Sequence, residues 1–192
     1  MPHAGHRTRE HGLTLTELLV SLGITSLLAA TAVEHLPRFI QSARMAGDDN
    51  RFVTALHLAR NEAVKRRRHL VLCPAADGDV CAGQADWKNG WLLFPSDNNR
   101  EREPQETLIL RETPLTAGIA MRSGGRRKRI VYQPDGSSGG SNSSFTFCDR
   151  RGLASPRVIC LSNTGRPRLS MTRCDGRPET LSLIHISEPT RL

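Results

Sequence analysis

The sequence predicts an α+β fold in which one long N-terminal helix is followed by a small antiparallel β-sheet head. Two observations support this prediction. Uncharged residues run from Leu18 to Val33, and apolar residues then recur at helical spacing as far as Ala63. After Arg68 the pattern changes to short apolar runs separated by turn-forming residues, which is typical of strands. One helix before several short strands favours a segregated arrangement over alternating βαβ units.

The composition allows one modest domain besides the N-terminal helix. The chain has 192 residues, of which 38% are hydrophobic, so the head is expected to have a thin core. Its five cysteines fit a small domain that relies on disulfides. The formal net charge of +8 and the pI near 10.1 indicate a polyanionic partner, either nucleic acid or an anionic lipid surface. A basic protein without such a partner is the alternative.

Residues 13–36 form the predicted transmembrane and assembly helix. The uncharged run alone is roughly 24 Å long as a helix, and its extension to these bounds reaches the length that a bilayer requires. Basic residues in the preceding segment 1–12 predict that the N-terminus stays in the cytoplasm. Glu17 places a carboxylate inside this apolar helix, where an ionisable group usually has a function. An ordinary secretory signal would have a shorter apolar core followed by an A-x-A cleavage site, and no such site follows the run. The alternative is a plain signal anchor that contains Glu17.

Residues 37–68 are expected to continue the helix into the head. Pro37 predicts a kink, and Gly47-Asp48 is a second point of expected interruption. Beyond these points the apolar residues follow the 4-3-4 spacing of one helix face. They are Phe52, Leu56, Ala59 and Ala63.

Residues 69–178 form the predicted β-rich head. Gly136–Ser144 has low complexity and is interpreted as a flexible loop. Trp87 and Trp91 are assigned to the core, with base stacking as the alternative. The predicted strands are His69–Cys73, Trp91–Phe94, Thr107–Arg111, Ile119–Arg122, Ile130–Gln133, Phe145–Cys148 and Val158–Ser162.

The N-terminal residues resemble the prepilin leader motif of type IV pilins and type II secretion pseudopilins. Gly12, followed by Leu-Thr-Leu-Thr-Glu-Leu-Leu, carries the resemblance. It implies that residues 1–12 are a leader peptide, that a prepilin peptidase cuts between Gly12 and Leu13, and that Leu13 is then N-methylated. It also implies that Glu17 neutralises the terminal amine of a neighbouring subunit during assembly. Leu13 is a mild departure, because the family more often has phenylalanine there.

A second resemblance, to the GspH/FimT domain, extends the match to roughly residues 8–175. Its motifs are Ala59–Arg66, Leu72-Cys73-Pro74, Cys81, Trp87–Trp91, Cys148–Gly152 and Ser162–Arg168. The pattern resembles FimT minor pilins of type IV pili more than the secretion pseudopilin GspH. It implies a pilin-like lollipop, single-pass in the bacterial inner membrane with a periplasmic head and later part of a pilus. Other pilins or pseudopilins are the implied partners.

Two alternatives to a DNA-binding minor pilin remain. One is a type II secretion pseudopilin that binds other pseudopilins and no DNA. The other is a membrane-anchored nucleic-acid regulator, which requires a cytoplasmic head and does not fit the basic N-terminus or the cysteine pattern.

The cysteines predict disulfides if the head is periplasmic. Cys73 and Cys81 flank a short loop containing Pro, Gly and Asp, and this spacing favours a local bridge. Cys148, Cys160 and Cys174 leave three possible pairings. The resemblance favours Cys148–Cys174, which leaves Cys160 as a buried thiol, with Cys148–Cys160 as the alternative. No paired Cys or His spacing supports a zinc site instead.

Positive charge is concentrated at Lys65–Arg68, Arg122–Arg129, Arg150-Arg151 and the C-terminal arginines. Any one cluster is most simply a solvated surface, although Arg122–Arg129 is also a candidate for phosphate binding. Gly165–Arg168 places two arginines on one face of an extended chain, and guanidinium groups suit phosphate. This motif resembles the Gly-Arg-x-Arg motif that FimT-like minor pilins use for DNA uptake in natural transformation. The implied DNA-binding residues are Arg166 and Arg168, with Arg173, Arg150 and Arg151 as neighbours.

No catalytic, cofactor or metal site is predicted. Gly136–Gly140 matches G-x-S-x-G, but turns and loops flank it in place of the strand and helix of a nucleophile elbow. The sequence contains no P-loop, H-E-x-x-H or dinucleotide fingerprint. The chain is therefore expected to be a substrate of the prepilin peptidase and not an enzyme itself.

The C-terminal residues 179–192 do not fit the pilin pattern. Their sequence from Leu181 onward, LSLIHISEPTRL, resembles a translated sequencing adapter. We therefore expect this segment to be a non-native tail and exclude it from functional reasoning.

Overall fold

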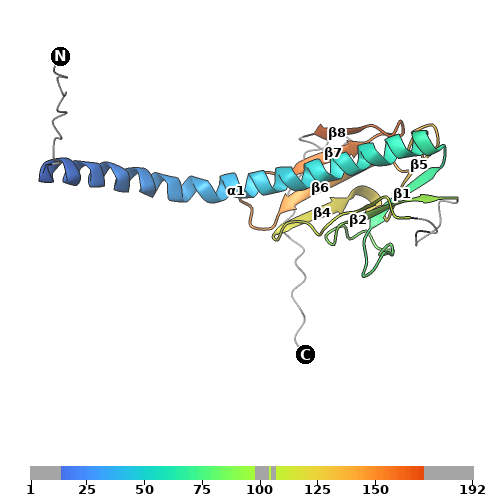
Figure 1. Ribbon diagram of the computed structural model, residues 1–192, viewed down its shortest axis with the longest axis horizontal. Coiled ribbons are helices and arrows are strands. Elements are labelled where there is room, and N and C mark those ends of the chain that lie inside the picture. The colour runs from blue at the N-terminus through green and yellow to red at the C-terminus, as the bar shows by residue number, and fades with distance from the viewer. Residues whose placement is uncertain (1–13, 98–103, 105–106, 171–192) are drawn as a thin grey trace, which may run out of the picture. The chain divides into compact units, whose positions relative to one another are not determined.

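The computed structural model describes residues 14–97, 104 and 107–170 (Figure 1). It divides into two compact units, Met1–Phe39 and Ile40–Leu192. Several predictions lie outside the described residues: the cleavage site, two C-terminal residues and the tail. They are Gly12, Leu13, Arg173, Cys174 and residues 179–192.

The helix α1 spans Leu15–Arg66 and continues through Pro37. No single straight helix in the described chain is long and apolar enough to cross a bilayer. Leu15–Ala30 and His35–Arg66 meet that requirement together, as a pair with a bend between them. The bend falls one turn before Pro37, where a proline removes a helical hydrogen bond. The expected interruption at Gly47-Asp48 is wrong, because both residues lie inside α1.

The structure confirms the predicted α+β arrangement of a long helix followed by an antiparallel β head, whose described strands form two four-stranded sheets. The first sheet has the order β3-β2-β1-β5 and contains β1 (His69–Pro74), β2 (Trp91–Ser96), β3 (Leu110–Arg111) and β5 (Ile130–Tyr132). The second has the order β4-β6-β7-β8 and contains β4 (Ile119–Ser123), β6 (Ser143–Asp149), β7 (Arg157–Leu161) and β8 (Pro167–Ser170). A short 3₁₀ helix, η1 (Gly124–Arg126), follows β4. The strand β8 was not predicted from the sequence, since it begins with proline and carries a basic residue.

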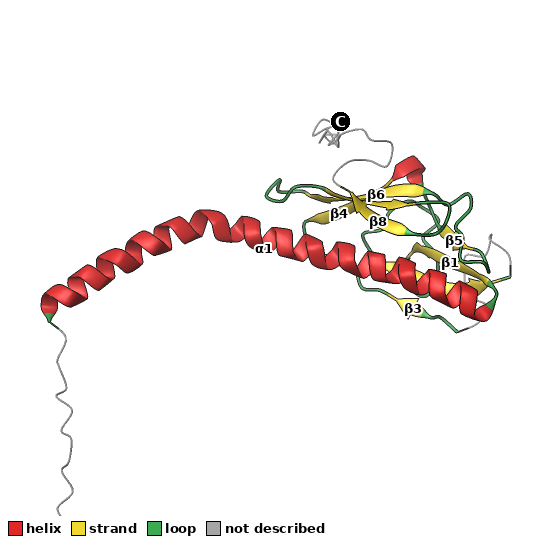
Figure 2. Ribbon diagram, turned by 90° about the horizontal axis from the view of Figure 1, so that it is seen from above, coloured by secondary structure: helices red, strands yellow, loops and turns green. Residues whose placement is uncertain are grey.

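Within the second unit, α1 packs against both sheets around Phe52. Figure 2 shows β4, β6 and β8 on one side of α1, and β1 and β5 near its C-terminal end. The Phe52 ring lies 5.6 Å from Trp87, 5.1 Å from Trp91 and 4.9 Å from Phe145, measured between ring centroids. All four side chains are fully buried, which confirms the predicted helix face and the core assignment of both tryptophans.

A smaller core lies on the other face of the first sheet. It contains Val71, Leu92 and Phe94, and a disulfide joins Cys73 to Cys81 beside them. Alternation along β1 explains the division, because Leu70 and Leu72 face α1 whereas Val71 and Cys73 face away.

The predicted Cys148–Cys174 bridge is wrong. Cys160 is disulfide-bonded, whereas Cys148, which is half-buried, is not. The strand order explains the difference: Cys160 on β7 pairs with Arg168 of β8, whereas β7 separates Cys148 on β6 from that strand. Cys148 also lies four positions along β6 from Ser144, the partner of Cys160. That offset is about 13 Å, too far for the alternative Cys148–Cys160 bridge.

Gly136–Ser144 was expected to be a flexible loop, and this interpretation is also wrong. Ser138 is fully buried and Ser141 nearly so. The Ser138 amide donates to the Asn163 carbonyl oxygen at 2.8 Å, and the Ser138 hydroxyl donates to that of Ser162 at 2.8 Å. The segment therefore packs tightly against the connection between β7 and β8.

Candidate functional site

The first unit begins with a helix cap. The Glu17 amide donates to Thr14 Oγ1 at 3.3 Å, so Thr14 caps α1 and Glu17 occupies its first turn. Thr14-x-x-Glu17 is the sequence pattern of a capping box. The negative side chain of Glu17 also suits the positive end of the helix dipole. Glu17, the residue predicted to act in assembly, therefore also stabilises the start of α1.

Buried acidic residues fix the second half of α1. Asp48 accepts hydrogen bonds from Arg51 at 2.6 Å and from the Thr116 amide at 2.9 Å. Asp49 forms an ion pair with Arg157 of β7. Burial raises the pKa of Asp49, while Arg157 acts in the opposite direction. These contacts fix α1 against Thr116 and against β7, the strand that leads to the turn with Arg166.

The turn between β7 and β8 is built on close backbone contacts. Gly165 has a φ of +75°, and a Cβ atom there would lie 2.2 Å from the Gly136 carbonyl oxygen. Only glycine fits such a position. The Gly136 oxygen in turn accepts a hydrogen bond from Arg60 Nε of α1 at 3.1 Å. The buried Tyr132 hydroxyl donates to the Gly165 oxygen at 3.3 Å, and burial raises the pKa of Tyr132, so it stays protonated.

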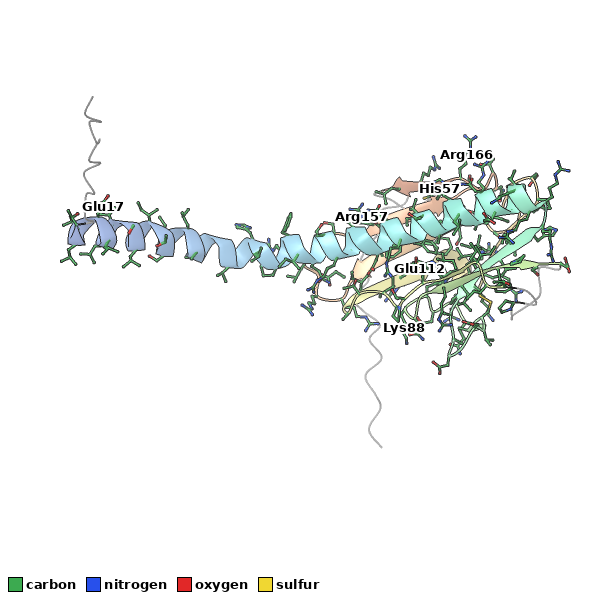
Figure 3. All side chains as sticks on the ribbon, in the orientation of Figure 1. Glu17, His57, Lys88, Glu112, Arg157 and Arg166 are labelled. Atoms are coloured by element: carbon green, nitrogen blue, oxygen red, sulfur yellow. A yellow bond between two sulfur atoms is a disulfide. The ribbon has the colours of Figure 1, made fainter. Side chains whose placement is uncertain are left out.

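This turn presents Arg166 and Arg168 to solvent. Both side chains are exposed, and among the described residues no carboxylate pairs with either. Arg66 and Arg111, by contrast, pair with Glu62 and Asp79. Arg166 projects from the side of the head that carries β7 and β8, whereas Lys88 lies on the opposite side (Figure 3). Two guanidinium groups without a carboxylate partner among the described residues, one on the turn and one near the start of β8, suit an oxyanion.

Arg150 and Arg151 do not join this pair. They follow β6 in the turn around Asp149, at the end of the second sheet where β6 leaves it. Ser143, at the other end of β6, pairs with Leu161, which in turn pairs with Pro167 beside Arg166. The two arginine pairs are therefore separated by about 20 Å along the strands.

The Asp149 turn has its own structural role. Its carboxylate accepts hydrogen bonds from three backbone amides, at 2.8–3.2 Å, and from Gln41 Nε2 of α1 at 3.0 Å. Burial acts to raise the pKa of Asp149, but these donors outweigh it and hold the pKa below its ordinary value. Arg150 and Arg151 therefore lie on a turn that anchors the start of the second half of α1.

Comparison with known families identifies this architecture. Residues 50–165 match the family described as type II transport protein GspH, which is more than half of the chain. The chain belongs to the GspH family. Residues 7–33 of this GspH-family chain match the prokaryotic N-terminal methylation motif. It is therefore a minor pilin or pseudopilin of a type IV pilus or type II secretion system, and not an enzyme. Such a chain is processed by a prepilin peptidase and anchored in the inner membrane before assembly.

The fold of this GspH-family chain is similar to that of a solved minor pilin. The type IV minor pilin FimU of Pseudomonas aeruginosa, in two crystal forms, has TM-scores of 0.55 and 0.50 at 17% and 18% identity. These matches cover 69% and 68% of this chain and 92% and 91% of FimU. The minor pseudopilin EpsH from the type 2 secretion system of Vibrio cholerae has a TM-score of 0.49 at 11% identity, covering 66% of this chain and 96% of EpsH. No curated protein sequence is significantly similar.

Sequence reasoning missed the residues that support the two arginines. Tyr132, Gly136 and Arg60 come from β5, a loop and α1, and only the folded chain brings them together. Thr14 was missed as well, although its capping-box spacing to Glu17 was a readable signal.

Proposed function

We propose that this chain is a FimT-like minor pilin of a type IV pilus, which helps pilus assembly and priming and binds DNA for uptake in natural transformation. The supporting observation is the pair Arg166 and Arg168, exposed on a turn fixed by Gly165 and without a carboxylate partner in the described residues. FimU, whose fold this chain shares, is a type IV minor pilin.

The arrangement favours binding to the DNA backbone without sequence preference. Guanidinium forks donate two hydrogen bonds to one phosphate, whereas base recognition needs an element that enters a groove. Binding by a single head is expected to be weak, with a Kd of roughly 10⁻⁴–10⁻⁶ M, and strongly dependent on salt. Several such heads in one pilus would raise the effective affinity.

The N-terminal residues are proposed to act in processing and assembly. The peptidase cuts between Gly12 and Leu13, Leu13 is N-methylated, and Glu17 neutralises the terminal amine of a neighbouring subunit. Thr14 caps α1 by accepting the Glu17 amide hydrogen, so Glu17 lies in the first turn of the helix. Mass spectrometry of the chain before and after peptidase treatment tests the cleavage position and the methylation directly.

The DNA proposal is tested with the full chain in detergent and a labelled DNA duplex, by fluorescence anisotropy across a salt series. The double variant Arg166→Ala/Arg168→Ala is compared with Arg150→Ala/Arg151→Ala, which removes the same charge from the other end of the sheet. We expect the first variant to lower the slope of log K against log salt by roughly 1.8, which corresponds to two phosphate contacts. The second variant is expected to change it little.

A type II secretion pseudopilin without DNA binding is the second candidate, because the matching family carries that description. Absence of DNA binding by the wild-type chain at low salt would favour it. Equal losses in the two double variants would show that net charge, and not the β7–β8 turn, attracts DNA.

A further inference from the structure

A pocket of about 340 Å³ lies beside β5, on the face of the first sheet that points away from α1. Val71 and Val131 pair in register on that face, and His69 and Gln133 follow at two-residue spacing on the same side. The lining residues are His69, Arg127, Arg129, Val131, Gln133, Gly139, Gly140 and Ser141. The described lining residues thus include two arginines, a histidine, a glutamine and a serine, and none of these described residues carries a carboxylate.

The polar wall of the pocket is held in place by its own hydrogen bonds. Arg127 donates from Nη1 to the Gly140 oxygen at 2.7 Å and from Nη2 to the Asn142 oxygen at 3.1 Å. Ser141 Oγ accepts the Val131 amide hydrogen at 3.0 Å, so the hydroxyl retains a proton to donate. Both side chains are therefore positioned before any ligand arrives, which reduces the entropic cost of binding.

The same loop connects this pocket to the β7–β8 turn. Gly139 and Gly140 line the pocket, and the adjacent Ser138 is bonded to the carbonyl oxygens of Ser162 and Asn163 in that turn. One ordered segment thus carries a donor-lined pocket on one side and supports the candidate DNA-binding turn on the other.

We propose that this pocket binds a phosphate group, namely a backbone phosphate of the same DNA that contacts Arg166 and Arg168. In that respect the inference rests on the proposed function. Arginine N–H groups match the oxygens of a phosphate, and Arg127 keeps Nε–H and a second N–H on each Nη besides those bonded to the two carbonyl oxygens. The hydroxyl, amide and imidazole groups add further donors. The two arginines among the described lining residues favour an anion over a cation. DNA then has a second contact point, set apart from the turn.

Two variants test the pocket in different ways. Gly139→Ala keeps every charge but places a methyl group 3.0 Å from Gln133 Nε2, within the lining. Its φ is not in the left-handed region, so the backbone accepts alanine. Arg129→Gln removes one guanidinium group. The matched control is Lys128→Ala, which removes the same charge from an exposed neighbouring residue that does not line the pocket.

The full chain in detergent is assayed with two probes, duplex DNA by anisotropy and inorganic phosphate by ³¹P line broadening. We expect Gly139→Ala and Arg129→Gln to weaken DNA binding by roughly threefold to tenfold and to abolish the phosphate broadening. Lys128→Ala should change DNA binding less than either and preserve the broadening. Near-ultraviolet circular dichroism establishes that each variant is folded.

The outcomes separate the two proposals. If both pocket variants behave like Lys128→Ala with both probes, the pocket is no phosphate site, whatever Arg166→Ala/Arg168→Ala does. If the wild-type chain binds no DNA but its phosphate broadening depends on Gly139 and Arg129, the proposed function fails. The pocket is then a site for a free phosphate group, and the DNA source named above is overturned.

Discussion

The two halves of α1 have opposite surfaces, although they belong to one helix. Before Ile40 the helix exposes large apolar side chains, with Leu22 at 62% and Phe39 at 72% exposure. After Ile40 it buries Phe52 completely, together with the charged Asp48 and Asp49. The apolar half carries the surface that a membrane or neighbouring subunits require, whereas the second half is completed by its own sheets. Hydrophobicity alone therefore does not indicate which half forms the core of the fold.

The largest expected difference between the halves is in core packing. Phe52→Ala should lower the free energy of unfolding by about 3–5 kcal/mol, because it opens a cavity among the buried rings of Trp87, Trp91 and Phe145. Phe39→Ala in the exposed half should change it by less than about 0.5 kcal/mol. Urea unfolding of the full chain in detergent, followed by fluorescence of Trp87 and Trp91, measures both. Equal effects would show that the two halves do not differ as described.

A smaller effect is expected where the second half begins. Asp149→Ala removes the acceptor for Gln41 and for three backbone amides, so we expect a loss of about 2–3 kcal/mol in unfolding free energy. The matched control is Asp135→Ala, an exposed carboxylate that accepts one backbone amide at 2.8 Å. The same urea titration should show a clearly smaller loss for this control, and similar losses would contradict the role of the Asp149 turn.

The Asp149 contribution should also depend on pH. Its folded pKa is lowered, so the folded state binds fewer protons than the unfolded state near the ordinary value of 3.8. Its stabilisation is therefore complete above that value and is lost as the pH falls through the lower folded pKa. The difference in stability between wild type and Asp149→Ala should shrink over that acidic range. A difference that stays constant there would mean that the carboxylate charge does not stabilise the turn.

The smallest expected effect distinguishes two helical glycines. A Cβ atom at Gly47 or at Gly23 would meet nothing within 4 Å. Gly47→Ala should stabilise the head by about 0.5–1 kcal/mol, because alanine has the higher helix propensity. Gly23→Ala lies in the exposed half and should leave the urea midpoint of the head unchanged. A matching increase from Gly23→Ala would indicate that both halves unfold together.

Features with a strong local pattern could be predicted from the sequence. The spacing of Phe52, Leu56, Ala59 and Ala63 placed them on the buried face of α1, as the structure confirms. Most strands were also predicted, with small differences at their ends. The exception, β8, is short and begins with Pro167, so neither periodicity nor β-propensity marks it.

Features that depend on sheet order could not be predicted. The local Cys73–Cys81 bridge was predicted correctly, but the predicted bridge of Cys148 was wrong, because β7, and not β6, lies beside β8. The grouping of Arg150 and Arg151 with Arg166 was wrong because strand register places them at opposite ends of one sheet. The segment with Ser138 and Ser141 was predicted to be a flexible loop, because composition does not reveal that their hydroxyl groups form buried hydrogen bonds.

The bond between Gln41 and Asp149 also has a mechanical consequence. Gln41 is the first buried residue of α1 among those whose side chains are described, and Asp149 belongs to the turn that ends β6. A pulling force applied to the N-terminal half of the helix therefore reaches the head first at this bond. The next ties along α1 are Asp48, which accepts the Thr116 amide hydrogen, and Asp49, which pairs with Arg157 of β7. Tension is thus shared between adjacent strands before it reaches the aromatic core.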